Sequence, residues 1–406
     1  MDALFTSTSA VCVTGLIVKD TPVDFTSFGH IVILLLIQIG GLGYMTAVTF
    51  MAVMRRQKVG HRDRLILQES LNYPGMDGLV RFLKIVFSTI FIIEVIGMVI
   101  LTLRFWVDMP LDRAAWFGIF HAVSAFNNAG FSLFSDNMMG YRSDFVINIT
   151  IPVLIILGGL GYLVLLELYH YHRGRVLRLS THTKLVLTMT VLLIVLGMAI
   201  LLSMEWNNPK SFGSMTTYQK ILAAWFTSVN YRTAGFNTID FSTLTDSNLF
   251  FGTFFMMTGG SPGGTAGGIK TTAVALALIG VWYTLRGDTR AHIFRRSLSP
   301  YQINKAYAII FVASIYVVVS TIILSEVERL PFLRILFETT SAFGTVGVST
   351  GNGGVLSYSA LFSDWGKLNI IILMLMGRVG VFAFTMVIVG KAVESRIKYA
   401  EGKVII

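Results

Sequence analysis

Seven long apolar segments constrain what this 406-residue chain can fold into. A membrane-spanning helix needs about 20 predominantly apolar residues. Segments of that kind lie at 29–54, 80–105, 145–170, 184–205, 247–284, 304–325 and 366–393. Charged residues make up 13% of the chain, which is half of the roughly 25% that is usual in soluble proteins. The sequence therefore predicts an all-α polytopic membrane protein.

Basic residues cluster beside the apolar segments, at 55–64, 173–184, 286–305 and 391–403. Cytoplasmic loops of membrane proteins are enriched in Lys and Arg. Helices that run into these clusters are therefore expected to end on the cytoplasmic side of the cell membrane, in a multi-pass arrangement. The net charge of +10 follows from this pattern, so we expect contact with membrane lipid and no nucleic-acid partner.

A short motif recurs four times, and its copies are expected on the side of the membrane opposite the basic clusters. Its copies are "LFTSTSAVCVTGL" (4–16), "IFHAVSAFNNAGF" (119–131), "AWFTSVNYRTAGF" (224–236) and "LFETTSAFGTVGV" (336–348). Each copy has an aromatic residue ten positions before a shared glycine, and three of the four have a serine six positions before it. Apolar segments of this length are too short to span a membrane and are typical of re-entrant elements.

A glycine-rich motif follows each copy, and it reads "IGGLGYM" (39–45), "LGGLGYL" (157–163), "TGGSPGG" (258–264) and "MGRVGVF" (376–382). The repetition predicts four pseudo-repeated helix–pore-loop–helix units around a central pore. Their predicted bounds are 1–60, 78–175, 183–290 and 303–406. Unit one begins at its pore helix, and we expect a further spanning helix to precede residue 1 in the complete protein.

The recurring glycine turns have the composition of a cation filter. Irregular backbone at membrane depth is tolerated only where it is buried in protein or lines a water-filled cavity, and rings of carbonyl oxygens can replace the hydration shell of a cation. Glycine permits the positive φ values that such turns use, and helix C-termini favour a cation. The predicted ligands of a monovalent cation are Val13, Thr14, Gly15, Asn127, Asn128, Ala129, Gly130, Thr233, Ala234, Gly235, Thr345, Val346 and Gly347.

Close helix packing is the alternative explanation for the glycines. It suits "GGLG" at 40–43 and 158–161. It does not suit the four turns, because packing of this kind would place Asn127, Asn128 and Arg232 on lipid-facing helices.

The segment "GGSPGGTAGGIKTT" (259–272) interrupts the fifth apolar segment. Glycine costs about 1 kcal/mol and proline about 3 kcal/mol at a helical position, so this segment is expected to form a loop. It differs from a phosphate-binding loop, which has glycine directly before its lysine, because Ile269 precedes Lys270. We expect a gate made of Gly259, Gly260, Ser261, Pro262, Gly263, Gly264, Thr265, Ala266, Gly267, Gly268, Lys270 and Arg378.

Arg378 is a charged residue inside an apolar segment, and such residues are usually functional. We expect it to form a cationic barrier near the pore and to hold the 259–268 loop. The alternative is a structural pairing with loop carbonyls or with Glu338.

These motifs together resemble the potassium-translocating membrane subunits of the Trk/Ktr/HKT superfamily, and most of all the Ktr-type subunit. "AVCVTG", "SAFNNAGF", "YRTAGFNT" and "TVGVSTG" are similar to the four filter sequences of that superfamily, and the resemblance covers essentially the whole chain. The resemblance implies uptake of potassium, or of sodium, as the transported ion, with no cofactor in this chain. Glycine in all four filters implies a preference for K⁺.

The resemblance also implies two kinds of partner. One is a second copy of the chain, in a homodimer whose protomers each have a pore. The other is a cytosolic RCK-type regulatory ring that binds ATP/ADP or NAD(H). The tail at 391–406 would contact the ring or the dimer, or would lie on the membrane surface.

Other functions fit these motifs less well. A Trk-type subunit and a sodium-permeable or alternating-access carrier remain alternatives, although the hallmark of many carriers is an inverted repeat and the repeats here are parallel. A membrane enzyme would need a cluster of His, Asp or Glu at membrane depth, and the sequence has no such cluster.

Overall fold

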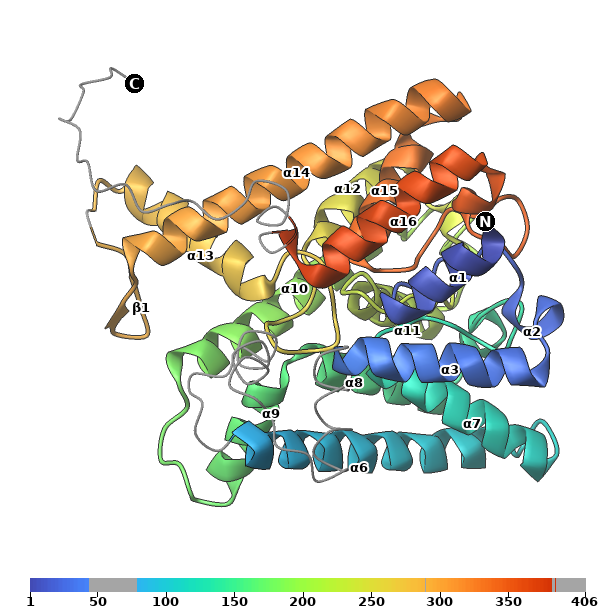
Figure 1. The fold of residues 1–406 in the computed structure, drawn as a ribbon, viewed down its shortest axis with the longest axis horizontal. Coiled ribbons are helices and arrows are strands. Elements are labelled where there is room, and N and C mark those ends of the chain that lie inside the picture. The colour runs from blue at the N-terminus through green and yellow to red at the C-terminus, as the bar shows by residue number, and fades with distance from the viewer. Residues whose placement is uncertain (44–78, 289, 382–383, 385–406) are drawn as a thin grey trace.

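The computed structural model describes residues 1–43, 79–288, 290–381 and 384, and within them the fold is almost wholly helical (Figure 1). The prediction of an all-α protein is confirmed. A short hairpin of β1 (His292–Ile293) and β2 (Arg296–Ser297) is the exception. The basic clusters at 55–64 and 391–403, and with them the C-terminal tail, lie outside the described residues.

Three long helices correspond to predicted spans. They are α6 (Leu79–Phe105), α10 (Thr181–Glu205) and α14 (Pro300–Glu328), and each is long and apolar enough to cross a membrane. Figure 1 shows α6 and α14 on opposite sides of the molecule, with α1, α3 and α16 between them. Outward-facing side chains such as Phe91 and Phe311 are 67% exposed on these helices, as expected for surfaces that contact lipid tails.

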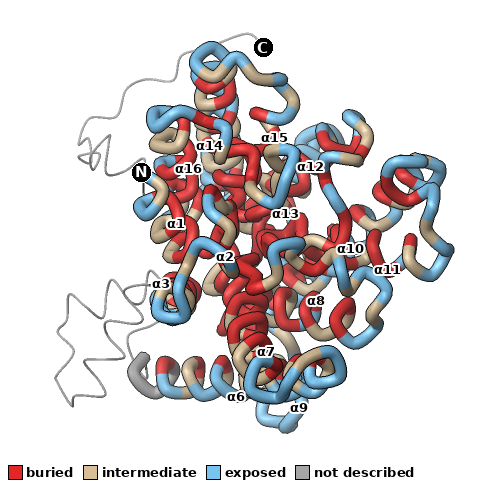
Figure 2. Tube along the Cα trace, turned by 90° about the vertical axis from the view of Figure 1, so that its right-hand side faces the viewer, coloured by how far each residue is buried: buried red, intermediate tan, exposed pale blue. Residues whose placement is uncertain are grey.

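Four short helices lie inside this frame. They are α1 (Asp2–Val11), α7 (Leu111–Phe126), α11 (Thr217–Asn230) and α15 (Phe332–Gly344). The last three each pack against the long helix that precedes them. Figure 2 shows buried residues concentrated in the interior, whereas buried, intermediate and exposed residues alternate along α6 at the margin. These helices coincide with the short apolar segments for which the sequence predicted pore helices.

A third set of helices follows the four turns. The set contains α3 (Ser27–Leu42), α8 (Phe145–Gly159), α12 (Asp246–Met257) and α16 (Asp364–Val379). The predicted apolar segment at 145–170 is bent at its glycine-rich middle, because α8 and α9 (Tyr162–His172) meet at an angle of 102°. The sequence expected an interruption in 247–284, and there α12 and α13 (Thr271–Leu285) are separated by the glycine-rich loop.

Short elements connect the helices on the side where the turns open. They are α2 (Thr21–Asp24) and the 3₁₀ helices η1 (Met139–Tyr141), η2 (Phe241–Thr243) and η3 (Tyr358–Leu361). The unit boundaries given above remain predictions, although the order long helix, pore helix, half-helix recurs in units two, three and four.

Candidate ion-conduction site

The four glycine turns share one backbone pattern. The glycine has a positive φ in each turn, and so does the residue two positions before it. The paired values are Val13 49° and Gly15 95°, Asn128 60° and Gly130 72°, Thr233 63° and Gly235 77°, Thr345 49° and Gly347 86°. Left-handed backbone costs a residue other than glycine about 1–2 kcal/mol. Strain of this kind persists where the surrounding structure enforces it, and it clusters at functional sites.

Backbone hydrogen bonds hold each turn to its own pore helix. The N–H of Thr14 donates to Ser9 O at 2.8 Å, and the same bond recurs from Ala129 to Ser124 and from Val346 to Ser341, each at 2.8 Å. The carbonyls that accept these bonds belong to the serines that recur in the sequence motif. Because the bonds turn the N–H groups back toward the pore helices, the turns can present carbonyl groups to the axis.

The turn of unit three is bonded to its short helix by a different backbone hydrogen bond. Its Ala234 N–H donates to Asn230 O at 3.2 Å, one residue nearer than in the other units. The sequence showed this departure only as the missing serine at position 229, which is Val229.

The four glycines converge on one axis. A Cβ added to Gly235 would lie 2.6 Å from Gly130 Cα and 3.2 Å from the carbonyl oxygens of Thr14 and Val346. A Cβ on Gly347 would collide with the Thr14 carbonyl as well. Segments more than a hundred residues apart therefore meet, and they leave no room for side chains at the glycine positions.

Two asparagines predicted for the second turn point to different places. The Nδ2 of Asn127 donates to Gln38 Oε1 at 2.9 Å and to Glu94 Oε1 at 3.0 Å, so its side chain lies between α3 and α6. The Oδ1 of Asn128 accepts from Thr265 Oγ1 at 2.9 Å. The network of Gln38, Glu94 and Asn127 was missed from the sequence, where Glu94 was visible only as an acid in an apolar segment.

A cavity of about 130 Å³ opens beyond the glycines. The glycines of all four turns line it, together with the acidic residues Asp20, Asp136 and Asp240. A concave surface that carries one sign of charge raises the local concentration of oppositely charged ions. This cavity therefore favours the arrival of cations at the outer end of the turns.

The 259–272 segment forms a closed loop on the other side of the turns. Its ends are paired, since Gly259 N–H donates to Ile269 O at 2.9 Å and Thr271 N–H to Gly260 O at 3.0 Å. The loop reaches the second turn through Thr265, whose hydroxyl donates to Asn128 Oδ1. It reaches the fourth turn at Gly267, where an added Cβ would collide with the Thr345 side chain.

The loop also binds the broken ends of neighbouring units. Ser261 N–H donates to Gly159 O at 2.9 Å and Thr265 N–H to Gly158 O at 3.1 Å, both at the end of α8. Gly268 N–H donates to Gly377 O of α16 at 3.1 Å. The loop from unit three is thus held by units two and four.

Arg378 adds unit one to this assembly. Its guanidinium donates to Thr265 O in the loop and to Gly40 O, and it donates to Gly41 O at 3.1 Å. It does not pair with Glu338, whose carboxylate accepts from Ser349 Oγ at 2.6 Å. Of the two pairings considered from the sequence, the structure contains the one with loop carbonyls.

Lys270 closes the loop from within, because its Nζ donates to Ala266 O at 2.6 Å. Among the described residues, no group of three or more His, Cys, Asp or Glu side chains could hold a metal ion. The arrangement suits passage of a monovalent cation along the glycine axis, past a loop that several units hold in place.

Comparison with known proteins gives concordant matches. The family described as TrkH, cation transport protein, matches residues 1–395. The chain is 39% identical over 404 residues to Ktr system potassium uptake protein B of Bacillus subtilis, a match that covers 100% of this chain and 89% of that protein. It is 36% identical over 404 residues to the protein of the same name from Vibrio alginolyticus, covering 100% and 87%.

A solved structure shows the same fold. The potassium transporter TrkH from Vibrio parahaemolyticus superposes with a TM-score of 0.74 at 18% identity, covering 96% of this chain and 78% of that one.

Proposed function

This chain belongs to the TrkH family of cation transport proteins, and we propose that it takes up potassium ions through the axis formed by its four glycine turns. It is a multi-pass protein of the cell membrane and an ion transporter, not an enzyme. The observation that carries the proposal is the convergence of Gly15, Gly130, Gly235 and Gly347, with the same pair of positive φ values in every turn.

In this proposal the carbonyl groups of the turns replace the water around K⁺. The oxygens belong to the filter residues named from the sequence. Each pore helix directs its C-terminal end toward the turn that follows it, and this negative end of the helix dipole favours a cation. Glycine in all four turns supports a preference for K⁺ over Na⁺.

The loop at 259–272 is proposed as the gate. It abuts Asn128 and Thr345 on the side opposite the outer cavity, so an ion leaving the turns meets the loop next. Arg378 both holds the loop and places a positive charge beside the path. Opening would require release of these hydrogen bonds or a shift of the half-helices that accept them.

We propose two partners as well. One is a second copy of the chain, and the other is a cytosolic RCK-type regulatory ring that binds a nucleotide. Both proposals are supported by the identity of 36–39% with proteins named as parts of a Ktr system and by the basic clusters expected on the cytoplasmic side.

The test of ion selection uses a bacterial strain that lacks its own K⁺ uptake systems. The wild-type chain, expressed with its regulatory partner, should restore growth at limiting K⁺, and Gly235→Ser should abolish growth or make it sensitive to Na⁺. Gly287→Ser is the matched control, because Gly287 also has a positive φ of 74° but has open space around it. A membrane-inserted wild type that fails to restore growth would overturn the potassium proposal.

A further inference from the structure

Asn137 lies outside the four turns but contacts two of them. We propose that its side-chain amide is a positioning element that fixes the outermost carbonyls of the second and third turns and thereby sets K⁺/Na⁺ selectivity. The inference rests on the proposed function, because it treats the glycine turns as the filter. Nothing in the recurring motif pointed to this residue, which follows Gly130 by seven positions in the loop between α7 and α8.

The amide of Asn137 bridges two units. Its Nδ2 is 3.4 Å from Gly130 O and 3.3 Å from Gly235 O. An asparagine amide has two N–H donors, so one side chain can serve both carbonyls, which a serine or threonine hydroxyl with its single donor cannot do. Asn137 also lines the outer cavity together with the four filter glycines.

The loop around Asn137 is joined to the chain beyond the third turn. Asn237 N–H donates to Asn137 Oδ1 at 3.3 Å, and Met138 N–H donates to Asn237 O at 3.0 Å. Asn137 has a φ of 57°, a conformation in which asparagine is enriched over most other residues. Two neighbouring bonds and the backbone conformation therefore fix the direction of the amide.

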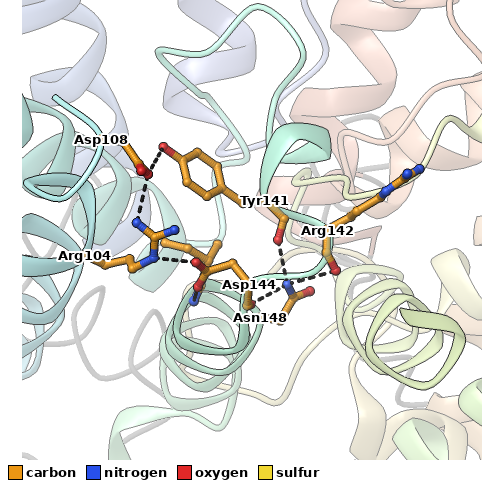
Figure 3. Close-up of polar contacts among 7 residues, drawn as sticks. Arg104, Asp108, Tyr141, Arg142, Asp144 and Asn148 are labelled. Carbon is orange, nitrogen blue, oxygen red and sulfur yellow. Dashed lines mark hydrogen bonds and ion pairs between the residues drawn. The ribbon is translucent and has the colours of Figure 1, made fainter. Parts of the chain in front are cut away.

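A second set of contacts anchors the same loop to the helices of unit two (Figure 3). Asn148 Nδ2 donates to Tyr141 O at 2.9 Å and to Asp144 O at 2.7 Å, and the guanidinium of Arg104 pairs with Asp144. Tyr141 OH donates to Asp108 Oδ2 at 3.2 Å. Burial, followed by the charge of Asp108, raises the pKa of Tyr141 to about 12, so this donor stays protonated at physiological pH.

Units one and four are not bridged by a side-chain amide of the kind that Asn137 provides between units two and three. Ile17 N–H donates to Ser357 Oγ at 2.9 Å, and Ser357 N–H donates to Ile17 O at 3.0 Å. These bonds lie two residues past Gly15 in unit one and ten residues past Gly347 in unit four. In the described part of the chain, no side chain donates to Gly15 O or Gly347 O. Only half of the outermost ring is therefore held by a side-chain amide.

This difference has a consequence for selectivity. Discrimination between K⁺ and the smaller Na⁺ depends on where the coordinating oxygens can move and how many of them reach the ion. With Asn137 in place, the oxygens of Gly130 and Gly235 cannot close inward around Na⁺. Without the amide, the ring can contract, and Na⁺ should be admitted.

The test compares two substitutions at Asn137 with one control. Asn137→Asp keeps the acceptor for Asn237 N–H but removes both donors, and Asn137→Gly removes the side chain at a position of positive φ. Asn352→Asp adds the same charge in the loop of unit four, where Asn352 Oδ1 accepts from Gly354 N–H at 3.0 Å. Uptake of K⁺ and of Na⁺ is measured on the full-length chain in proteoliposomes, with its regulatory partner present.

We expect both Asn137 variants to lower the K⁺/Na⁺ ratio of kcat/KM by about fivefold or more, as loss of two hydrogen bonds of typical net strength allows. K⁺ turnover should persist and Asn352→Asp should keep the wild-type ratio. An unchanged ratio in an Asn137 variant that still transports K⁺ would overturn the inference, and so would an equal change in Asn352→Asp. Absence of K⁺ uptake by the wild type would instead overturn the proposed function.

Discussion

The half-helices of units one, two and four end in one way, and that of unit three ends in another. In units one, two and four, a glycine of the half-helix packs against a carbonyl of the preceding short helix. That carbonyl lies four residues before the glycine of the turn. The pairs are Gly40 with Val11 O, Gly158 with Phe126 O and Gly377 with Phe343 O, and an added Cβ would collide with that carbonyl in each. Each half-helix then breaks at a single glycine of positive φ, at Gly43, Gly161 or Gly380.

In unit three the equivalent glycine contacts its own loop. A Cβ on Gly259 would collide with Gly267 O, and the break extends from Thr258 to Lys270. Unit four has a second departure, because Arg378 occupies the position of Gly41 and Gly159 in the repeat. The two departures meet in the hydrogen bond from Arg378 to Thr265 O. The departures from the repeat therefore meet at the glycine-rich loop, whereas all four turns keep the same pair of positive φ values.

The largest effect is expected at the close contact in α8. Gly158→Ala should destabilise the protein by about 3 kcal/mol, the upper end of the usual cost of overpacking, because backbone cannot move aside there. Gly159→Ala is the matched control, since its Cβ would lie 3.6 Å from Asn128 Nδ2, an ordinary contact. The readout is the fraction of monodisperse protein that survives heating in detergent. Equal losses in the two variants would refute the packing argument.

Deleting Pro262 to Ala266 should give the next largest effect. The paired ends at Gly259 and Ile269 can still close a shorter loop, while the part that touches Asn128 is removed. We expect K⁺ flux in proteoliposomes to rise about tenfold, as for removal of a barrier of roughly 1.4 kcal/mol. Flux at the wild-type level in a folded variant would show that the loop does not obstruct the ion path. The longer break in unit three would then have no effect on conduction.

Arg378→Ala should act in the same direction but less strongly. It removes the hydrogen bonds to Thr265, Gly40 and Gly41, and bonds from charged groups contribute about 1.5–3 kcal/mol each. Part of the lost hydrogen-bond free energy lowers the stability of the folded protein and does not lower the barrier at the gate. Flux should therefore rise by about fivefold. Arg378→Lys retains the charge with a different donor geometry. Its flux should lie between that of the wild type and that of Arg378→Ala. A decrease in flux for Arg378→Ala would contradict the barrier role.

Thr265→Val gives the smallest expected change. The hydroxyl donates to Asn128 Oδ1 and lies 3.2 Å from Phe126 O, and one neutral hydrogen bond contributes about 1 kcal/mol. If about 0.65 kcal/mol of this acts on the barrier, flux should rise about threefold, with unchanged K⁺/Na⁺ selectivity. Thr238→Val serves as a control at a buried threonine outside the loop. A change in selectivity would mean that Thr265 shapes the filter as well as the gate.

The sequence predicted the repeat well because the four turns require the same residue types at the same spacing. The three continuous spans agree with their apolar segments for a similar reason, since length and composition decide them. The break at Gly161 could not be predicted in this way. A glycine costs a helix only about 1 kcal/mol, so "GGLG" is compatible with either a straight or a broken helix.

Contacts between units also could not be predicted from the sequence. The position of Arg378 was visible in the sequence, but its choice between loop carbonyls and Glu338 depends on how unit four packs on unit three. The side chains of Asn127 and Asn137 likewise find their partners on other segments, at Glu94 and at Gly235. No local periodicity encodes such pairings, and the role of the filter residues as ion ligands remains a prediction.

The position of the bound ion is the most direct test of whether these turns select the cation. Rb⁺, a heavy substitute for K⁺, can be located by anomalous diffraction from crystals of the full-length protein. A peak is expected on the axis among Gly15, Gly130, Gly235 and Gly347, ringed by carbonyl oxygens. A protein that transports Rb⁺ but shows its anomalous peaks only elsewhere would contradict the claim that these turns select the cation.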